Sequence, residues 1–306
     1  MASSLPVPGK RFVIGVPYAW LFAFFLLPFL ILLYISFVDM GESIHPFKPL
    51  WDPETGILQL KYENYWEIFR DLDAGGQLFQ TLYIEAYLRS IWYALLTALL
   101  CLALGYPFAY FIARSPASVR PALLLMVMLP FWTSFLLRVY AWKGLLADQG
   151  VINKTLMLLG VVDEPIMMLY TNVSMLVGMT YVYLPFMVLP LYANLVKMDF
   201  RLLEAAYDLG TTPFKAFWLV TVPLSRAGII AGFMLVFIPS LGEFVIPSLL
   251  GGPENLMIGR VVWDEMFTSN NWPRASALAV VMILLIVVPL AVYYHYTGDR
   301  TKGGQP

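Results

Sequence analysis

A carboxylate stands inside the apolar stretch "FIPSLGEFVIPSLL", and this residue, Glu243, is the side chain best placed to bind a cation. Two prolines and a glycine interrupt the same stretch. Proline removes a backbone donor, and irregular backbone at membrane depth is tolerated only where protein or a wet cavity satisfies it. An ionisable side chain at such a place indicates a functional site. We expect Glu243 either to receive a cationic amine or to form a structural ion pair with Arg138 or Arg89.

Three aromatic residues in neighbouring apolar segments, Trp132, Tyr181 and Tyr183, are candidates for the same pathway. The face of an aromatic ring attracts a cation that lies within about 6 Å of the ring centre. The alternative is that these rings pack in the core or lie at a membrane interface, where Trp and Tyr are enriched.

A different pattern occurs in "EAAYDLGTTPFKAFWLVTVP" (204–223), which lies between two apolar blocks. Asp199 is placed to cap a helix, and Gly210 is placed to end that helix in a left-handed conformation. Thr212 and Pro213 are of the types preferred at the cap and the first residue of a second helix. Helices in bundles are usually joined by about 2–8 residues, whereas roughly thirty are used here. We interpret the helical hairpin as a partner surface rather than as an ordinary interfacial linker.

Motifs for other chemistries are absent from the sequence. It contains no G-x-x-x-x-G-K-[ST] phosphate loop, so we expect ATP hydrolysis to occur in another chain. The H-E-x-x-H and G-x-S-x-G motifs of metalloproteases and hydrolases are also missing. The lone Cys101 lies in an apolar run, and His45 and His295 are far apart. We expect no catalytic residue, no metal site and no cofactor.

The composition indicates a membrane protein. Of the 306 residues, 60% are hydrophobic and 13% are charged, against roughly 45–50% and about 25% in soluble domains. The net charge of −1 argues against a nucleic-acid-binding protein. Segments long enough to cross a bilayer, about 20 apolar residues each, predict an all-α polytopic fold with six transmembrane helices. These segments cover residues 12–38, 88–112, 121–145, 171–196, 227–250 and 275–297.

The distribution of Lys and Arg predicts the orientation, because these residues are enriched in cytoplasmic loops. With the N-terminus inside, ten of the 19 basic residues lie in inner segments and six in longer outer loops. We therefore expect a cytoplasmic tail at 1–11, a transmembrane domain at 12–297 with a cytoplasmic hairpin at 197–226, and a cytoplasmic tail at 298–306.

The outer loop from Asp39 to Gln80 is acidic. It is either a solvated loop or a docking surface that also attracts cations. Within it, "YENYWEIF" fits a short amphipathic helix with Tyr65, Trp66 and Phe69 at the membrane interface.

The hairpin resembles the EAA loop of ABC-importer permeases, whose pattern is E-A-A-x3-G-x9-I-x-L-P. The matching residues are Glu204, Ala205, Ala206, Gly210 and Pro223. Valine replaces isoleucine and leucine at positions 220 and 222, which are conservative apolar changes. The stretches "PFWTSFLLRVYAW" and "PSLGEFVIPSLLGGPENLMIGRVVW" extend the resemblance to polyamine-import permeases, especially the putrescine type.

This resemblance implies a type I ABC-importer permease (MetI-like) fold in the inner membrane of a bacterium. It implies a coupling role for the EAA helix, which seats on a separate ATPase subunit. The expected partners are a second permease subunit, two ATP-binding subunits, an external substrate-binding protein and membrane lipid. The expected activity is import of putrescine or a related polyamine by alternating access. The alternatives are a permease for another small solute and an autonomous secondary transporter or channel.

Overall fold

The computed structural model describes residues 10–41, 46–51, 56, 58, 60–69 and 82–302. These residues are mostly helical, with two isolated antiparallel β-bridges, Met40 with Phe47 and Trp51 with Leu58. The chain divides into two compact units. Unit 1 comprises residues 1–84 and 261–306, and unit 2 comprises residues 85–260. Most of the predicted tail at 1–11, and much of the acidic loop, lie outside the described residues.

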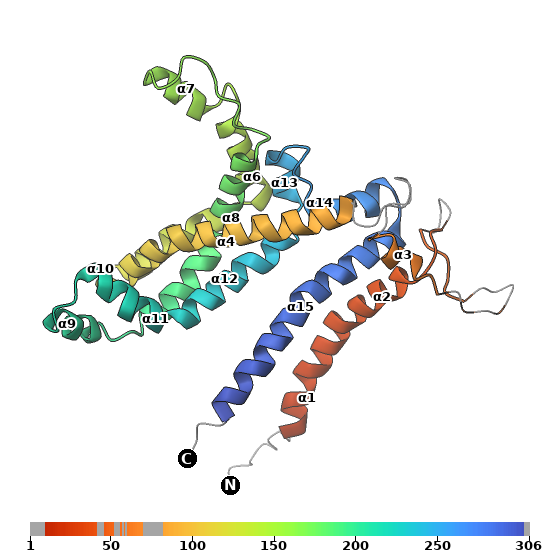
Figure 1. Cartoon of the computed structure of the whole chain (residues 1–306), viewed down its shortest axis with the longest axis horizontal. Coiled ribbons are helices and arrows are strands. Elements are labelled where there is room, and N and C mark those ends of the chain that lie inside the picture. The colour runs from red at the N-terminus through yellow and green to blue at the C-terminus, as the bar shows by residue number, and fades with distance from the viewer. Residues whose placement is uncertain are drawn as a thin grey trace, which may run out of the picture. The chain divides into compact units, whose positions relative to one another are not determined.

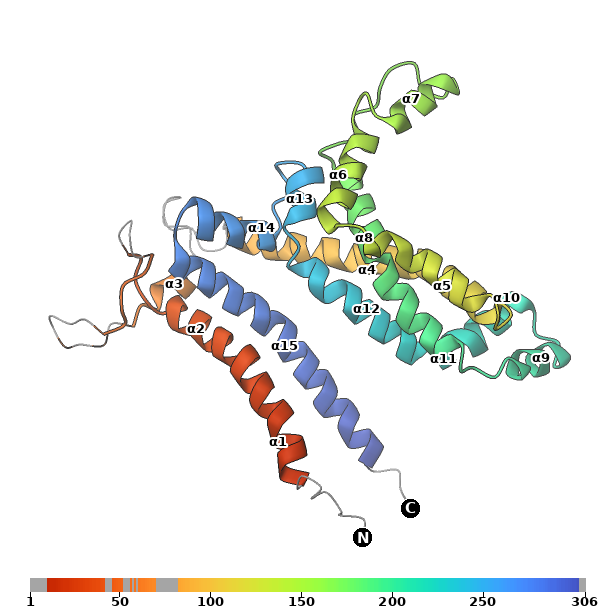
Figure 2. The same ribbon diagram turned by 180° about the vertical axis from the view of Figure 1, so that it is seen from behind.

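Unit 1 is built on two long helical rods that lie side by side (Figures 1 and 2). The first rod consists of α1 (Lys10–Leu21), a π-helical turn (Phe22–Leu26) and α2 (Leu27–Ser36). The second rod is α15 (Trp272–Lys302), which packs against α2 and runs beyond the predicted end of the last span at 297. The π turn ends two residues before Pro28, which supplies no backbone donor to a regular helix.

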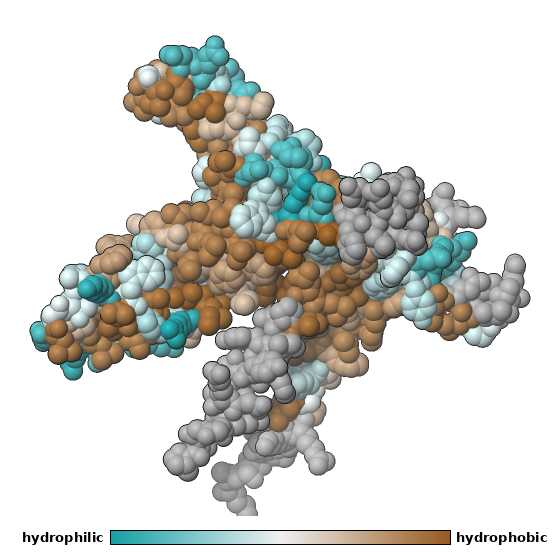
Figure 3. Space-filling model, viewed as in Figure 1, coloured by the Kyte–Doolittle hydropathy of each residue, from teal (hydrophilic) through white to brown (hydrophobic). Residues whose placement is uncertain are grey.

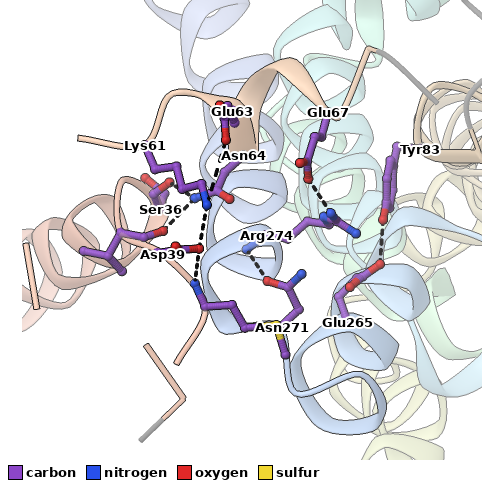
Figure 4. Close-up of polar contacts among 12 residues, drawn as sticks. Ser36, Asp39, Lys61, Glu63, Asn64, Glu67, Tyr83, Glu265, Asn271 and Arg274 are labelled. Carbon is purple, nitrogen blue, oxygen red and sulfur yellow. Dashed lines mark hydrogen bonds and ion pairs between the residues drawn. The ribbon is translucent and has the colours of Figure 1, made fainter. Parts of the chain in front are cut away.

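Polar contacts fasten the loop after α2 to the ends of these rods (Figure 4). The buried amide of Asn64 donates to the carbonyls of Ser36 and Val38, at 3.0 and 2.9 Å. These bonds satisfy two carbonyls at the end of α2, where no further helical turn follows. Glu67 accepts a hydrogen bond from Arg274 in the first turn of α15.

The predicted amphipathic helix in this loop is a single turn, α3 (Glu63–Trp66). The Tyr65 hydroxyl lies 2.6 Å from the Ser36 hydroxyl, whereas Trp66 and Phe69 are exposed. A turn this short presents no continuous apolar face, so the polar contacts above, rather than amphipathicity, order it.

Unit 2 contains the helices that carry the candidate sites. Most of α4 (Leu82–Arg114) belongs to it, followed by the long central helix α8 (Asn172–Leu195) and by α12 (Arg226–Leu241). The shorter elements of this region are α5 (Arg120–Met128), η2 (Leu129–Trp132), α6 (Phe135–Leu146), α7 (Val151–Leu158), α9 (Arg201–Asp208), α10 (Pro213–Ala216), η3 (Phe217–Thr221), α11 (Val222–Leu224), α13 (Val245–Leu250) and α14 (Ile258–Trp263), which a π turn, η4 (Asp264–Thr268), follows.

The core of unit 2 forms around α8, whose Met179, Met187 and Leu191 are fully buried. α12 packs along this helix and approaches it closely at Gly228 and Gly232. A Cβ atom at Gly232 would lie 2.7 Å from the Met187 sulfur, which is closer than real Cβ contacts occur. Small residues spaced four apart allow helices in membranes to pack backbone to backbone. Figure 3 shows a broad hydrophobic surface over the part of unit 2 that contains α4 and α12.

The spanning elements differ from six straight helices. Among the described residues, three helices are long and apolar enough to cross a membrane: 12–36, 82–114 and 172–195. The prediction of one continuous helix over 121–145 is wrong, because the chain turns by 86° between Trp132 and Phe135. Pro130 precedes this bend, and Thr133 and Ser134 are extended there.

The fifth segment is also interrupted, as its prolines and glycine predicted. α12 ends at Leu241, and α13 begins at Val245 after a three-residue break. A further bend of 70° separates the hairpin from α12. Within α15, the second rod of unit 1, residues Trp272–Val288 form an apolar helix that is shorter than the three spans above.

Candidate functional site

The hairpin at 201–224 is held by local caps. Asp199 Oδ1 accepts a hydrogen bond from the Arg201 amide at 3.0 Å. The predicted N-cap is therefore wrong by one residue, because the N-cap of α9 is Phe200, although the Asp199 side chain still bonds the first amide of the helix. A carboxylate at a helix N-terminus satisfies a free donor and complements the helix dipole.

Gly210 forms the corner of the hairpin and has a φ of +82°, in the left-handed region. The amide of Gly210 bonds to the carbonyl of Tyr207 at 2.8 Å, and that of Thr211 bonds to Ala206 at 3.0 Å. This pair of bonds is a Schellman motif, which ends helices at glycine. The predicted left-handed corner is confirmed.

The second helix of the hairpin starts as the sequence predicted. Thr212 is the N-cap of α10, and its hydroxyl accepts from the Lys215 amide at 3.5 Å. Pro213 occupies the first turn, where its missing donor has no cost. The helix continues through the π turn η3 (Phe217–Thr221) into α11, which contains Pro223.

The surface of the hairpin is unusually apolar for an exposed segment. Glu204 and Ala205 are exposed, Ala206 is half-buried, and Leu209 beside the corner is 86% exposed. Further large apolar side chains are exposed along the second helix: Phe214, Trp218 and Leu219. An apolar patch of this kind indicates a surface that binds another molecule.

Glu243 occupies the break between α12 and α13 and is 8% exposed. Its Oε1 accepts from the amides of Val245 and Ile246, at 3.0 and 3.3 Å. Its Oε2 accepts a hydrogen bond from the hydroxyl of Tyr183 on α8. The carboxylate thus caps α13 and is held in place from the central helix.

Neighbouring elements lock this break in position. The carbonyls of Gly242 and Glu243 lie so close to Gly259 at the start of α14 that no side chain fits there. The Ile258 amide donates to the Ser90 hydroxyl at 2.7 Å, which attaches α14 to α4. Sequence reasoning did not identify Gly259 or Ser90, because only the fold brings them beside the break.

The proposed ion pairs of Glu243 are not formed within the described part of the chain. Arg89 pairs with Glu85 at 3.0 Å and donates to the carbonyl of Glu254. Arg138 is buried and lies over the rings of Phe131 and Phe135. The nearest named partners of Glu243 are therefore neutral donors.

The candidate aromatic residues have different surroundings. Tyr183 is buried and contacts Glu243 through its hydroxyl. Tyr181, two residues along α8, stacks edge-on against Trp142 at 5.5 Å between centroids. Trp132 ends the 3-10 turn before the bend and is 75% exposed. The structure brings Tyr183 to Glu243, and the roles of Trp132 and Tyr181 stay predictions.

Comparison with known proteins decides the family. The protein family described as "Binding-protein-dependent transport system inner membrane component" matches residues 10–301 of the chain. This chain belongs to that family. The resemblance inferred from the EAA loop is thereby confirmed, and the chain is a permease component of an ABC transporter.

Several members of the family are similar over nearly their whole length. The chain is 36% identical over 286 residues to the spermidine/putrescine transport system permease protein PotB of Haemophilus influenzae, covering 93% of each chain. It is 37% identical to the PotB protein of Escherichia coli, covering 90% of this chain and 93% of that one. The inner membrane ABC transporter permease YdcU of Escherichia coli is 33% identical over 70% of this chain and 72% of its own.

Solved structures support the fold of this family member. One chain of a bacterial ABC transporter that imports the polysaccharide alginate superposes with a TM-score of 0.65 at 14% identity, covering 95% of this chain and 96% of that one. A chain of a bacterial alginate ABC transporter, in complex with an alginate-bound periplasmic protein, superposes with a TM-score of 0.58 at 18% identity. The match covers 96% of this chain and 99% of that one. At this level of identity the likeness shows a shared fold and nothing of the substrate.

Proposed function

We propose that this chain is the membrane-spanning permease subunit of an ATP-driven importer for putrescine or a related polyamine. The observation that carries the proposal is the 36–37% identity, over nine-tenths of both chains, to permeases named for spermidine and putrescine. The buried carboxylate at a broken span fits such a substrate, because a polyamine presents ammonium groups that require an anionic acceptor.

Glu243 has the geometry of a preorganised acceptor. A carboxylate offers about four acceptor positions, and three of those of Glu243 are used by Val245, Ile246 and Tyr183. By this count one acceptor position is left for an incoming ammonium.

The hairpin supplies the coupling surface in this proposal. Glu204, Ala205, Ala206 and the Gly210 corner would seat on a separate ATP-binding subunit, present in two copies. The bond to Asp199, the Gly210 corner and the Thr212 cap would order the hairpin, so that it transmits movement of the ATPase to α12 through Pro223. The N- and C-termini would be cytoplasmic, in keeping with the Lys and Arg distribution.

The proposed assembly also contains a second permease subunit and an external substrate-binding protein. Reconstitution of the purified assembly in liposomes tests the whole proposal. Uptake of labelled putrescine should require ATP on the hairpin side and binding protein on the other side. Uptake by this chain alone, without ATP, would instead support an autonomous transporter. ATP-driven uptake that putrescine and spermidine fail to compete for would support a permease for another solute.

A further inference from the structure

An apolar groove of about 510 Å³ opens on unit 2 between α4, the second helix of the hairpin and α12. α4 contributes Leu99, Ala103 and Tyr110 to its walls, while Trp218 and Ile229 come from the other two elements. The groove does not include Glu243 or the Gly210 corner, and it lies outside the proposed substrate pathway.

Two tyrosines, Tyr106 and Tyr110, line the groove, and the hydroxyl of each is hydrogen-bonded to a neighbouring side chain. The Tyr106 hydroxyl is bonded to the Ser225 hydroxyl at 2.7 Å, and both residues are buried. The Tyr110 hydroxyl accepts a hydrogen bond from Arg114 at 3.3 Å. Because the remaining lining is apolar, the groove suits a hydrocarbon chain better than a polar solute.

The dimensions fit one leaflet of a bilayer. Leu99 and Tyr110 lie eleven residues apart on a helix, which corresponds to a length of roughly 16 Å. The hydrocarbon core of a bilayer is about 30 Å thick, so this length is close to the thickness of one leaflet.

A cation stands at one end of the groove. Arg114 is exposed, and its guanidinium carbon lies 5.6 Å from the ring centre of Tyr110 and 5.9 Å from that of Phe200. Within the described ranges, no carboxylate oxygen lies within 4.0 Å of this guanidinium. A guanidinium has five N–H donors in a fork that matches phosphate oxygens, and the bond to Tyr110 uses one of them.

We propose that this groove binds an anionic phospholipid, with an acyl chain along Leu99 to Tyr110 and the phosphate on Arg114. The lipid would join α4 to the second helix of the hairpin through Trp218, and so stiffen the coupling element. Its assignment to the cytoplasmic leaflet, which is anionic, rests on the proposed orientation. The site itself does not depend on the transported substrate.

The test measures retained lipid and does not require transport. The chain is purified from bacterial membranes in mild detergent with its co-purifying subunits, and phosphatidylglycerol and phosphatidylethanolamine per chain are quantified by mass spectrometry. Ala103→Phe fills the groove, and Arg114→Gln removes the phosphate partner. The matched controls are Leu104→Phe, an exposed position on α4 outside the groove, and Arg120→Gln, a basic residue just beyond the same end of α4.

Retained phosphatidylglycerol should fall roughly fivefold in Arg114→Gln, the loss expected for one basic residue at an anionic surface. It should fall at least as far in Ala103→Phe, while both controls keep the wild-type amount. Three results would overturn the proposal: equal retention in all variants, an equal fall of phosphatidylethanolamine in Arg114→Gln, or loss of a co-purifying permease in Ala103→Phe without loss of lipid. Arg114→Gln changes only an exposed side chain, so the test holds even if Ala103→Phe folds poorly.

Discussion

The hydroxyl of Tyr183 on α8 donates a hydrogen bond to Glu243 in the break between α12 and α13. The same carboxylate accepts two amides at the start of α13. One buried side chain therefore joins the central helix to a broken span at the position proposed to receive substrate. A bound ammonium would act on both helices through this carboxylate, which is a direct route from substrate binding to movement.

Removing the charge of Glu243 should reduce transport. Glu243→Gln keeps the size and one carbonyl oxygen for the cap of α13, but it removes the charge that an ammonium requires. A charge-assisted hydrogen bond of about 1.5–3 kcal/mol corresponds to a tenfold to hundredfold loss of uptake. Labelled putrescine uptake, normalised to membrane abundance, measures this effect.

The matched control is Glu254→Gln, because Glu254 is exposed on the same unit. It should transport normally. Normal uptake by Glu243→Gln at normal abundance would remove this residue from the pathway. Poor abundance of Glu243→Gln would instead indicate that the carboxylate acts mainly by holding α13 to α8.

Tyr183→Phe should weaken transport less than Glu243→Gln does. It removes one donor and leaves a buried carboxylate oxygen without that partner, which typically costs about 1–3 kcal/mol. Since an ammonium can replace the missing donor, we expect the loss to appear mainly at low putrescine concentration. Tyr192→Phe on the same helix is the control. Equal losses of uptake in Tyr183→Phe and the control Tyr192→Phe, at all putrescine concentrations, would mean that Tyr183 only packs.

The hairpin shows how far local sequence rules reach. Gly210 and Thr212 were assignable to a corner and a cap, and Asp199 to a cap within one residue, because each acts through its own neighbouring backbone. The bend at Thr133 and Ser134 was not predicted, because an apolar run has the same composition whether it is straight or bent. Periodicity and length therefore located the third segment but not its shape.

The partners of Glu243 illustrate the opposite case. The prolines and glycine around it predicted a broken helix, and the break is present. Tyr183, however, is sixty residues away in sequence, and only packing of α12 on α8 brings it to the carboxylate. Gly259 could not be recognised either, because its importance lies in the carbonyls that pack against it.

Substitution at the Gly210 corner should uncouple the ATPase without preventing insertion. Gly210→Val forces a β-branched residue into the left-handed region, although nothing lies near the added side chain. We expect less ATPase co-purification and less transport at normal abundance. Glu204→Lys should act similarly, by reversing an exposed charge on the same surface.

Gly160 provides a matched control for strain. It also has a positive φ, +66°, with no neighbouring atom where a side chain would start, and it lies beyond α7 rather than in the hairpin. Gly160→Val should carry a similar local cost and keep the ATPase. If both glycine variants retain the ATPase and transport equally, the corner has no coupling role.

Close packing of α12 on α8 should tolerate no side chain at Gly232. Gly232→Ala places a methyl group against Met187, which is fully buried. Overpacking of this kind typically costs about 1–3 kcal/mol, so the thermal midpoint of the purified assembly should fall. Gly144→Ala adds a methyl group where nothing lies within 4 Å, and its midpoint should not fall. Equal midpoints for both variants would contradict the packing described here.

An ion pair between Asp39 and Lys61, in the acidic loop, should be insensitive to pH near neutrality. Burial raises the pKa of Asp39. The hydrogen bond and the charge of Lys61, whose Nζ lies 2.8 Å from Asp39 Oδ1, together lower it by more, so the pKa of Asp39 lies below its ordinary value. The hydrogen bond to Asp39 raises the pKa of Lys61. Stabilisation from Asp39 is present above about pH 3.9 and lost as pH falls through its lowered pKa. Stabilisation from Lys61 is present below about pH 10.4 and lost as pH rises through its raised pKa.

The difference in thermal midpoint between wild type and Lys61→Met should therefore be constant from about pH 5 to about pH 9. Both side chains are more than one-third exposed, so the difference should also be small. A difference that changes steadily across this range would show that other titrating groups act on the pair.

The orientation can be read by thiol labelling in intact cells. A cysteine at Asp52, in the acidic loop, should react with an impermeant reagent, whereas one at Lys215 in the hairpin should react only after the membrane is opened. The native Cys101 is buried and should stay silent in both cases. The reverse labelling pattern would place the hairpin outside and remove the proposed coupling surface.

Uptake of labelled putrescine by cells that lack this chain tests the central claim most directly. The account predicts that deletion abolishes the energy-dependent uptake and that the wild-type gene restores it. It also predicts that unlabelled spermidine or putrescine competes, whereas sugars, sulfate and phosphate do not. Unchanged putrescine uptake in the deletion strain, with loss of uptake of an unrelated solute that the gene restores, would contradict the account.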